Sequence, residues 1–236
     1  MKKINNIFLK KKILIYGLGK SGISTYNFLR HKAYINLFDD NPKNNIRLEK
    51  KKLSFTKILK SDFDFIIISP GIDFSKCKLS KYLKQNSSKV YTDFDVFYSF
   101  FSNDSVTITG TNGKSTTAKL LYDVLRDQKK DARLVGNIGN PILSEKKIIN
   151  KTFFVIEASS YQLEYSKIFK SKYSAILNIT PDHIERHKNF KNYIEAKFRL
   201  LDSQTTQSVA FVKRNDPVII KKLRSKKYKQ KIIKVD

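Results

Sequence analysis

Residues 109–117 combine glycine, lysine and hydroxyl side chains in a spacing suited to phosphate chemistry. They read Thr-Gly-Thr-Asn-Gly-Lys-Ser-Thr-Thr and stand between a short apolar run and a segment of helical length. Glycines let backbone N–H groups approach a polyphosphate, a lysine supplies positive charge, and a hydroxyl can bind Mg²⁺. The pattern therefore predicts a nucleoside triphosphate site, although its loop is shorter than G-x-x-x-x-G-K-[ST]. The residues expected to bind ATP are Gly110, Thr111, Asn112, Gly113, Lys114, Ser115, Thr116 and Thr117.

Polar side chains follow other apolar runs of the same half of the chain. Glu157 comes directly after the run 153–156, and His183 lies shortly after the run 175–177. Because the carboxyl ends of parallel strands meet at one edge of a sheet, we expect both residues, with Asn137, to face the phosphate loop. A carboxylate beside a triphosphate loop suits Mg²⁺, which prefers one or two carboxylates plus phosphate oxygens and waters. Glu157 is therefore a candidate magnesium ligand, whereas His31 and His187 are expected to be structural.

A second glycine-rich turn lies near the N-terminus. Residues 17–22 read G-x-G-x-x-G after an apolar run, and Asp39 ends the next run 22 residues after Gly17. This is the spacing of a dinucleotide-binding unit, and taken literally it predicts NAD. The same turn can hold any diphosphate, so a UDP-carrying substrate and NAD both stay open on this evidence.

The apolar runs between these motifs define the elements that position them. They are continuous rather than alternating, as expected of strands covered on both faces, and stretches of helical length separate them. The fold class is therefore α/β with mostly parallel sheets. We predict strands over 13–16, 34–38, 65–68, 106–109, 133–135, 153–156, 175–177 and 209–212, and helices over 116–128 and 193–201.

The amino-acid composition indicates which kinds of partner the protein binds and in which cellular compartment it works. Lys and Arg number 47 and Asp and Glu 21, which gives a formal net charge of +26 and favours polyanionic partners. Nucleic acid is the less favoured of these, because the basic segment 213–236 is better explained as a solvated helix and strand. The single cysteine, Cys77, excludes an internal disulfide, and no apolar run approaches the ~18 residues of a membrane helix. We expect a cytoplasmic protein without membrane contact.

The quoted motifs together resemble those of the ATP-dependent Mur ligases of peptidoglycan synthesis, from Gly17 to about Leu201. Residues 110–116 and 178–183 resemble signatures of the whole superfamily, which includes the folylpolyglutamate synthetases. Residues 69–72 and 136–139, and above all Glu-Ala-Ser-Ser-Tyr-Gln-Leu-Glu at 157–164, resemble the branch that adds D-glutamate.

The resemblance implies a fold, a domain division and a reaction. It implies a Rossmann-like domain over residues 1–93 that binds the UDP substrate, followed by a P-loop-type ATPase domain over 94–236. That second domain would be incomplete, and the family's third, amino-acid-binding domain would be absent. The implied reaction uses ATP to add D-glutamate to UDP-N-acetylmuramoyl-L-alanine through an acyl phosphate, in a monomeric enzyme. The alternative is a truncated, non-catalytic protein that binds the UDP precursor or a nucleotide.

The resemblance also implies residue roles. Catalysis would involve Lys114, Glu157, His183 and Lys197, with a carbamylated Lys197 supporting a second Mg²⁺. Asp40 and Asn41 depart from the family, which often has a hydroxyl and a basic residue there. The implied metal ligands are Ser115, Glu157, His183 and Lys197. The implied substrate contacts are Gly19, Lys20, Ser21, Asp39, Ser69, Asn137, Ser159 and His183.

Overall fold

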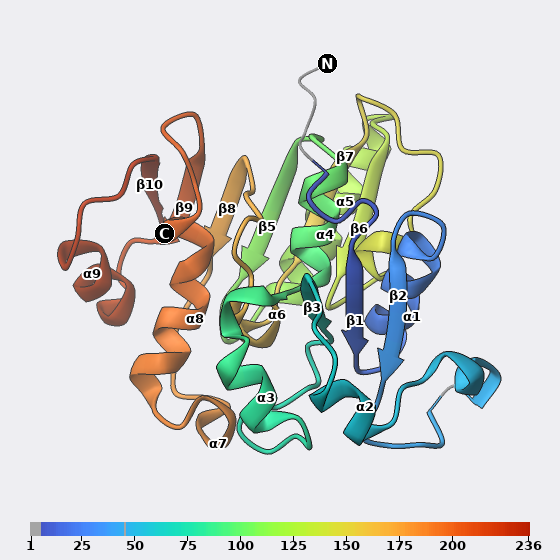
Figure 1. Cartoon of the computed structure of the whole chain (residues 1–236). Coiled ribbons are helices and arrows are strands. Elements are labelled where there is room, and N and C mark those ends of the chain that lie inside the picture. The colour runs from blue at the N-terminus through green and yellow to red at the C-terminus, as the bar shows by residue number, and fades with distance from the viewer. Residues whose placement is uncertain (1–5, 45) are drawn as a thin grey trace. The chain divides into compact units, whose positions relative to one another are not determined.

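The apolar runs form two separate parallel sheets in the computed structural model, which describes residues 6–44 and 46–236 (Figure 1). By their internal contacts the elements divide into two units. The first unit extends to Phe101 and also contains the segments 141–144 and 165–167, and the second contains the rest of the chain from Ser102. The α/β class expected from the sequence is confirmed.

The first unit contains a four-stranded sheet in the order β2-β1-β3-β4. All three strand pairs are parallel, and the strand residues with buried apolar side chains pack against helices of the same unit. The runs 13–16, 34–38 and 65–68 are confirmed as strands, whereas the last strand, only two residues long, was too short to be recognised by periodicity. The strands are β1 (Lys12–Tyr16), β2 (Tyr34–Phe38), β3 (Phe65–Ile68) and β4 (Val90–Tyr91).

Helix α4 (Asp93–Phe100) belongs to the first unit, although the domain division was expected at residue 93. A capping box with Thr92 and Asp95 begins this helix. Phe100 at its end packs against Phe28 of α1, with the ring centroids 4.9 Å apart. The unit's other α-helices are α1 (Lys20–Leu29), α2 (Phe55–Leu59) and α3 (Ser80–Gln85), and its 3₁₀ turns are Ile46–Lys51, Ser87–Lys89 and Ile142–Ser144.

The second unit contains a six-stranded sheet in the order β10-β9-β8-β5-β7-β6, and every strand pair is parallel. The central strand β5 is buried along its whole length, although its sequence Ser-Val-Thr-Ile-Thr alternates polar and apolar residues. The five strands predicted in this half are confirmed, within two residues at each end. The strands are β5 (Ser105–Thr109), β6 (Ala132–Gly136), β7 (Phe153–Glu157), β8 (Tyr173–Ile176), β9 (Val209–Lys213) and β10 (Lys231–Val235).

Helices in this unit connect the parallel strands. The basic segment after residue 213 forms α9 and β10, the solvated helix and strand expected of it. Asp216 caps α9 by accepting hydrogen bonds from the backbone N–H groups of Val218 and Ile219. The helices are α5 (Lys114–Asp127), α6 (Ser160–Glu164), α7 (Ile184–His187), α8 (Phe190–Asp202) and α9 (Pro217–Arg224). In the described part of the chain, no helix is long and apolar enough to cross a membrane.

Candidate active site

The glycine-lysine loop joins β5 to the N-terminus of α5. Gly113 precedes the helix with φ +81°, a left-handed conformation that a residue with a side chain adopts only at a cost. Lys114, Ser115, Thr116 and Thr117 then form the first turn of α5, in which the Thr117 N–H donates to the Gly113 carbonyl at 3.0 Å. The N–H groups of the three residues before Thr117 have no partner inside the helix. Such a turn provides hydrogen-bond donors and positive potential for an anion, as the sequence pattern predicted.

Asn178, just beyond β8, holds this loop in place. Its side-chain carbonyl accepts the Asn112 N–H at 2.8 Å, and its amide donates to the Asn112 carbonyl at 3.1 Å. Its backbone carbonyl also accepts the Thr111 N–H at 2.9 Å. Asn178 opens the motif 178–183, but the sequence assigned it no role of its own, because its partner lies 66 residues away in the chain.

Glu157, Ser115 and Asn137 come together at the carboxyl ends of β7, β5 and β6. Glu157 is fully buried, and its two carboxylate oxygens accept the Ser115 hydroxyl and the Asn137 amide, each at 2.8 Å. Among the residues described, no group of three or more His, Cys, Asp or Glu could hold a metal. The Ser115 and Glu157 oxygens are suitable ligands for Mg²⁺. In nucleotide sites the protein supplies one or two such oxygens, and phosphate and water supply the rest.

The two lysines expected at the site differ in their surroundings. Lys114 donates to the carbonyl of Thr111 at 2.7 Å, and no carboxylate of the described residues lies within ion-pair distance of it. Lys197 is buried and donates to the carbonyl of Gly110 at 2.7 Å. Burial, then repulsion from Lys114, lowers the pKa of Lys197 to about 7, against a smaller opposite effect of Asp182. The Lys197 amine is therefore easier to deprotonate than an ordinary lysine.

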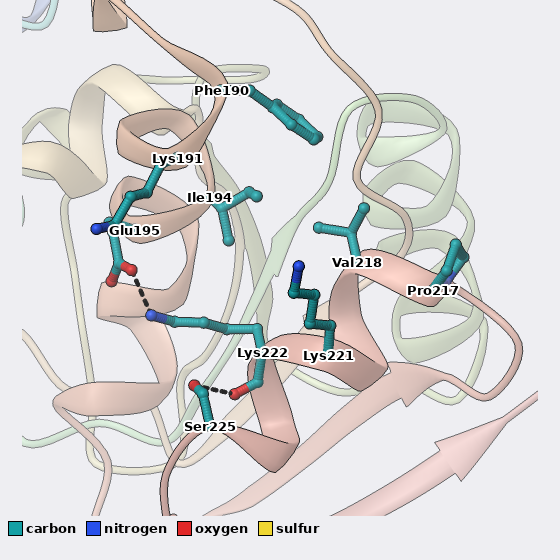
Figure 2. A pocket seen from close by; sticks show the side chains of 9 residues that line it. All are labelled: Phe190, Lys191, Ile194, Glu195, Pro217, Val218, Lys221, Lys222 and Ser225. Carbon is teal, nitrogen blue, oxygen red and sulfur yellow. Dashed lines mark hydrogen bonds and ion pairs between the residues drawn. The ribbon is translucent and has the colours of Figure 1, made fainter.

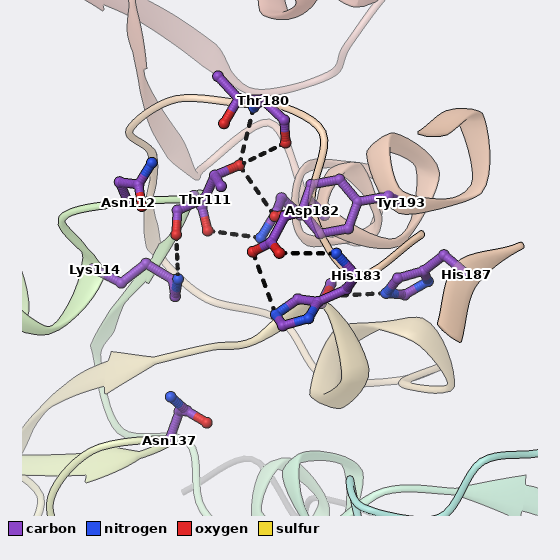
Figure 3. Close-up of polar contacts among 12 residues, drawn as sticks. Thr111, Asn112, Lys114, Asn137, Thr180, Asp182, His183, His187 and Tyr193 are labelled. Atoms are coloured by element: carbon purple, nitrogen blue, oxygen red, sulfur yellow. Dashed lines mark hydrogen bonds and ion pairs between the residues drawn. The ribbon is translucent and has the colours of Figure 1, made fainter. Parts of the chain in front are cut away.

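His183 lies in the loop between β8 and α7, near the residues that hold the phosphate loop (Figure 3). It adopts φ +53°, and its backbone N–H donates to Asp182 at 2.9 Å. Its Nε2 lies 3.4 Å from the other Asp182 oxygen, which orients the exposed ring. Figure 3 also draws Lys114 and Asn137. Asn137 is linked through the Glu157 carboxylate to Ser115, the residue after Lys114.

His187 is buried one helical turn after His183, and the sequence treated it as structural. Its Nε2 lies 3.0 Å from the Ser160 hydroxyl, and its ring stacks on Tyr161 at 5.5 Å between centroids. Burial, then the charge of Arg186, lowers the pKa of His187 to about 4, so the ring is neutral at pH 7. The i, i+4 spacing from His183 is a signal in the sequence that could have placed His187 beside that residue.

Ser159, an implied substrate contact, takes part in the turn that starts α6. Its hydroxyl donates to Gln162 Oε1 at 3.1 Å and accepts the Gln162 backbone N–H at 3.3 Å. These bonds fix the segment that follows Glu157.

In the first unit, the glycine turn and Ser69 meet where β1 and β3 end. An added Cβ at Gly22 would lie 1.8 Å from the Gly17 carbonyl oxygen, so α1 approaches this turn closely. The Ser69 hydroxyl donates to the same carbonyl at 2.7 Å. Gly19 precedes α1, and Lys20 begins it, so that this helix presents its N-terminus at the turn.

Asp39 is occupied by backbone groups of its own unit. It accepts the Leu18 N–H at 2.6 Å and the Asn41 N–H at 2.8 Å. Asp39 therefore shapes the glycine turn, besides any contact with a ligand. Burial raises the pKa of Asp93 to about 6, against the lowering effects of the Phe94 N–H, which donates to it at 3.0 Å, and of Ser21 in the first turn of α1.

A cavity of about 660 Å³ lies between α8 and α9 (Figure 2). Phe190, Ile194 and Val218 provide apolar walls, and Lys222 forms an ion pair with Glu195 at its side. The lining contains none of the predicted site residues, so this cavity is separate from the chemistry expected at the phosphate loop.

Comparisons with known proteins match both units to domains of the same family. The family model described as "Mur ligase MurD-like, N-terminal domain" matches residues 11–90, and "Mur ligase middle domain" matches residues 108–236. A protein of Caldicellulosiruptor saccharolyticus is 38% identical over 207 residues, which cover 82% of this chain and 46% of that protein. A protein of Rickettsia bellii is 35% identical over 212 residues, which cover 87% of this chain and 46% of that protein. Both are named UDP-N-acetylmuramoylalanine--D-glutamate ligase. The chain thus spans about half the length of these curated relatives.

Solved structures share the fold at low sequence identity. The UDP-N-acetylmuramate:L-alanyl-gamma-D-glutamyl-meso-diaminopimelate ligase of Neisseria meningitides matches with a TM-score of 0.60 and 14% identity, covering 95% of this chain and 77% of that one. The UDP-N-acetylmuramate-alanine ligase of Thermotoga maritima matches with a TM-score of 0.50 and 16% identity, covering 88% and 50%. These likenesses confirm the expected fold, in which a Rossmann-like domain is followed by a P-loop-type α/β domain.

Proposed function

The chain belongs to the Mur ligase family, and from this premise we propose that it carries the UDP-substrate and ATP sites of a ligase that adds D-glutamate to UDP-N-acetylmuramoyl-L-alanine. The shared name of relatives at 35–38% identity supports D-glutamate as the amino acid added. ATP would transfer its γ-phosphoryl group to the L-alanyl carboxylate, which gives an acyl phosphate and ADP. The amine of D-glutamate would then attack the acyl carbon, form the amide bond and expel phosphate. This activation is needed because a carboxylate does not condense with an amine at neutral pH.

The contact of Ser115 with Glu157 beside the phosphate loop carries this proposal. In the first step an anionic carboxylate must approach an anionic phosphate, so catalysis has to neutralise charge and align the two groups. Lys114 and the N-terminus of α5 would bind the phosphates, and Ser115 and Glu157 would hold Mg²⁺. The metal would supply the remaining positive charge.

We further propose that His183 and Lys197 serve a second Mg²⁺. A cationic Lys197 would repel the metal, whereas a carbamate on the same nitrogen would be an anion. The lowered pKa of Lys197 supports this modification, because CO₂ reacts with the neutral amine. Asn137 and Ser159, on the segments flanking Glu157, would contact the muramoyl substrate.

The first unit would bind the UDP portion of the substrate. The match of residues 11–90 to a Mur ligase domain supports UDP rather than NAD at the glycine turn. Gly19, Lys20, Ser21, Asp39 and Ser69 would form this site. The requirement for ATP and the single cysteine, Cys77, support a cytoplasmic location.

Calorimetry and phosphate release from the 236-residue chain test the proposal. We expect saturable binding of Mg·ATP and of UDP-N-acetylmuramoyl-L-alanine. If the chain turns over, phosphate release should require both that precursor and D-glutamate, with L-alanine and diaminopimelate as control acceptors. If the chain binds neither Mg·ATP nor the UDP precursor, the proposed function is refuted. If L-alanine or diaminopimelate supports phosphate release as well as D-glutamate does, the choice of D-glutamate is refuted.

A further inference from the structure

The hydroxyl of Thr111 makes three hydrogen bonds inside the protein. It donates to the Thr180 carbonyl at 3.1 Å, accepts the Thr180 N–H at 3.0 Å and lies 3.1 Å from the Tyr193 hydroxyl. A hydroxyl has one proton and two lone pairs. Because the Thr111 proton goes to Thr180, the Tyr193 hydroxyl must be the donor to Thr111. The Thr111 side chain therefore has no capacity left for a phosphate, and it anchors the loop instead.

Tyr193 connects this anchor to other parts of the site. It lies on α8 and is 1% exposed. The Nζ of Lys197, one helical turn later, lies 4.6 Å from the centroid of its ring. The ring also packs against His187, with 5.4 Å between centroids. One buried side chain thus contacts the phosphate loop and the helix that follows His183 (Figure 3), and also the buried Lys197.

We propose that Tyr193 is a positioning residue for the phosphate loop. Its hydroxyl holds Thr111, and with it the backbone N–H groups of the loop, in the arrangement that binds Mg·ATP. The position of Lys114 also depends on this bond, because its ammonium donates to the Thr111 carbonyl at 2.7 Å. A shift of Thr111 would therefore move this positive charge. The inference rests on the proposed function, since it takes ATP as the ligand of the loop.

Removal of the hydroxyl alone tests this role. Tyr193→Phe keeps the ring and its contacts. It removes the hydroxyl that donates to the Thr111 side-chain oxygen, so that oxygen accepts one hydrogen bond fewer. We expect the Kd for Mg·ATP, measured by calorimetry on the 236-residue chain, to rise about five- to tenfold. Tyr228→Phe is the matched control, because among the described residues the buried Tyr228 hydroxyl has no hydrogen-bond partner. Its Kd should stay within about twofold of wild type, as expected for loss of an unbonded group.

A double-mutant cycle separates positioning from simple stabilisation. Thr111→Val removes this bond together with both bonds to Thr180, so it should weaken Mg·ATP binding at least as much as Tyr193→Phe. The double variant should bind no more weakly than Thr111→Val alone. Thr111→Ser, which keeps the hydroxyl, should restore near-normal affinity.

Several results would overturn the inference. A wild-type Kd in Tyr193→Phe, even with a lower melting temperature, would show a merely structural hydroxyl, and losses that multiply in the double variant would show independent roles. If Tyr193→Phe does not fold, unchanged affinity in Thr111→Val overturns the inference. Wild-type chain that does not bind Mg·ATP would refute the proposed function as well, so the two failures are distinguishable.

Discussion

Replacement of Glu157 by glutamine would test the proposed magnesium site with little change in shape. Glutamine can direct its carbonyl oxygen to the Asn137 amide and its NH₂ group to the Ser115 hydroxyl, which rotates to accept. Both 2.8 Å contacts of the wild-type carboxylate thus have a counterpart in the variant. The substitution removes the negative charge and the oxygen that faces Ser115.

The size of the effect follows from what the carboxylate would contribute to Mg·ATP binding. Glu157 is fully buried, so solvent does not screen its interaction with a cation. A hydrogen bond or metal contact to a charged group is worth about 2–3 kcal/mol, which corresponds to about 30- to 150-fold in Kd. We expect this loss for Mg·ATP and a much smaller one for ATP without metal. Replacing a buried charge by an amide should leave the melting temperature unchanged or higher.

Calorimetric titrations with ATP, in magnesium or in EDTA, would measure both affinities on the same protein. Glu195→Gln is the matched control, since the same substitution in the same unit then affects only the partly exposed ion pair with Lys222. It should bind Mg·ATP as wild type does.

Wild-type affinity of Glu157→Gln for Mg·ATP would refute the reasoning, because the carboxylate could not then be the protein's contribution to the metal. An equal loss with and without magnesium would show that Glu157 shapes the loop rather than holding the ion.

Further predictions concern stability. Gly22→Ala should lower the free energy of unfolding by about 1–3 kcal/mol in chemical denaturation, because the added Cβ would lie 1.8 Å from the Gly17 carbonyl oxygen. Gly19→Ala, whose Cβ would meet nothing within 4 Å, should change it little, and equal effects would contradict the packing argument. Since the folded-state pKa of Lys197 is about 7 against an ordinary 10.5, the unfolded state binds more protons between these values. Stability should therefore rise with pH in that window, and Lys197→Met should reduce the slope by up to about 1.4 kcal/mol per pH unit. Identical slopes would disprove the shift.

The strands and the chemistry of the loop could be predicted from the sequence because they depend on local patterns. Runs such as 65–68 and 153–156 are almost fully buried, so they read as continuous apolar segments. Gly113 before Lys114 indicates a helix N-terminus through backbone sterics alone. Strand β4 was missed because two residues carry no period, and the contacts of α4 with the first unit lie outside any local pattern.

The strand-end rule also predicted which polar residues would share an edge of a sheet. Glu157 met Ser115 as expected, because parallel strands bring their carboxyl ends together. The same rule could not say how each side chain would use its donors and acceptors. Asp39, predicted to contact a ligand, also accepts the Leu18 and Asn41 N–H groups, which no strand-end rule indicates.

Composition, local period and motif spacing by themselves determined the α/β class, the phosphate loop and the residue types available for ligase chemistry. Only the tertiary structure decided that Asn178 clamps the loop, that Tyr193 donates to Thr111 across 82 residues, and that Lys197 is buried with a lowered pKa. The physical reason is that a backbone pattern repeats within a few residues, whereas hydrogen-bond partners and burial depend on the order of strands in the folded sheet.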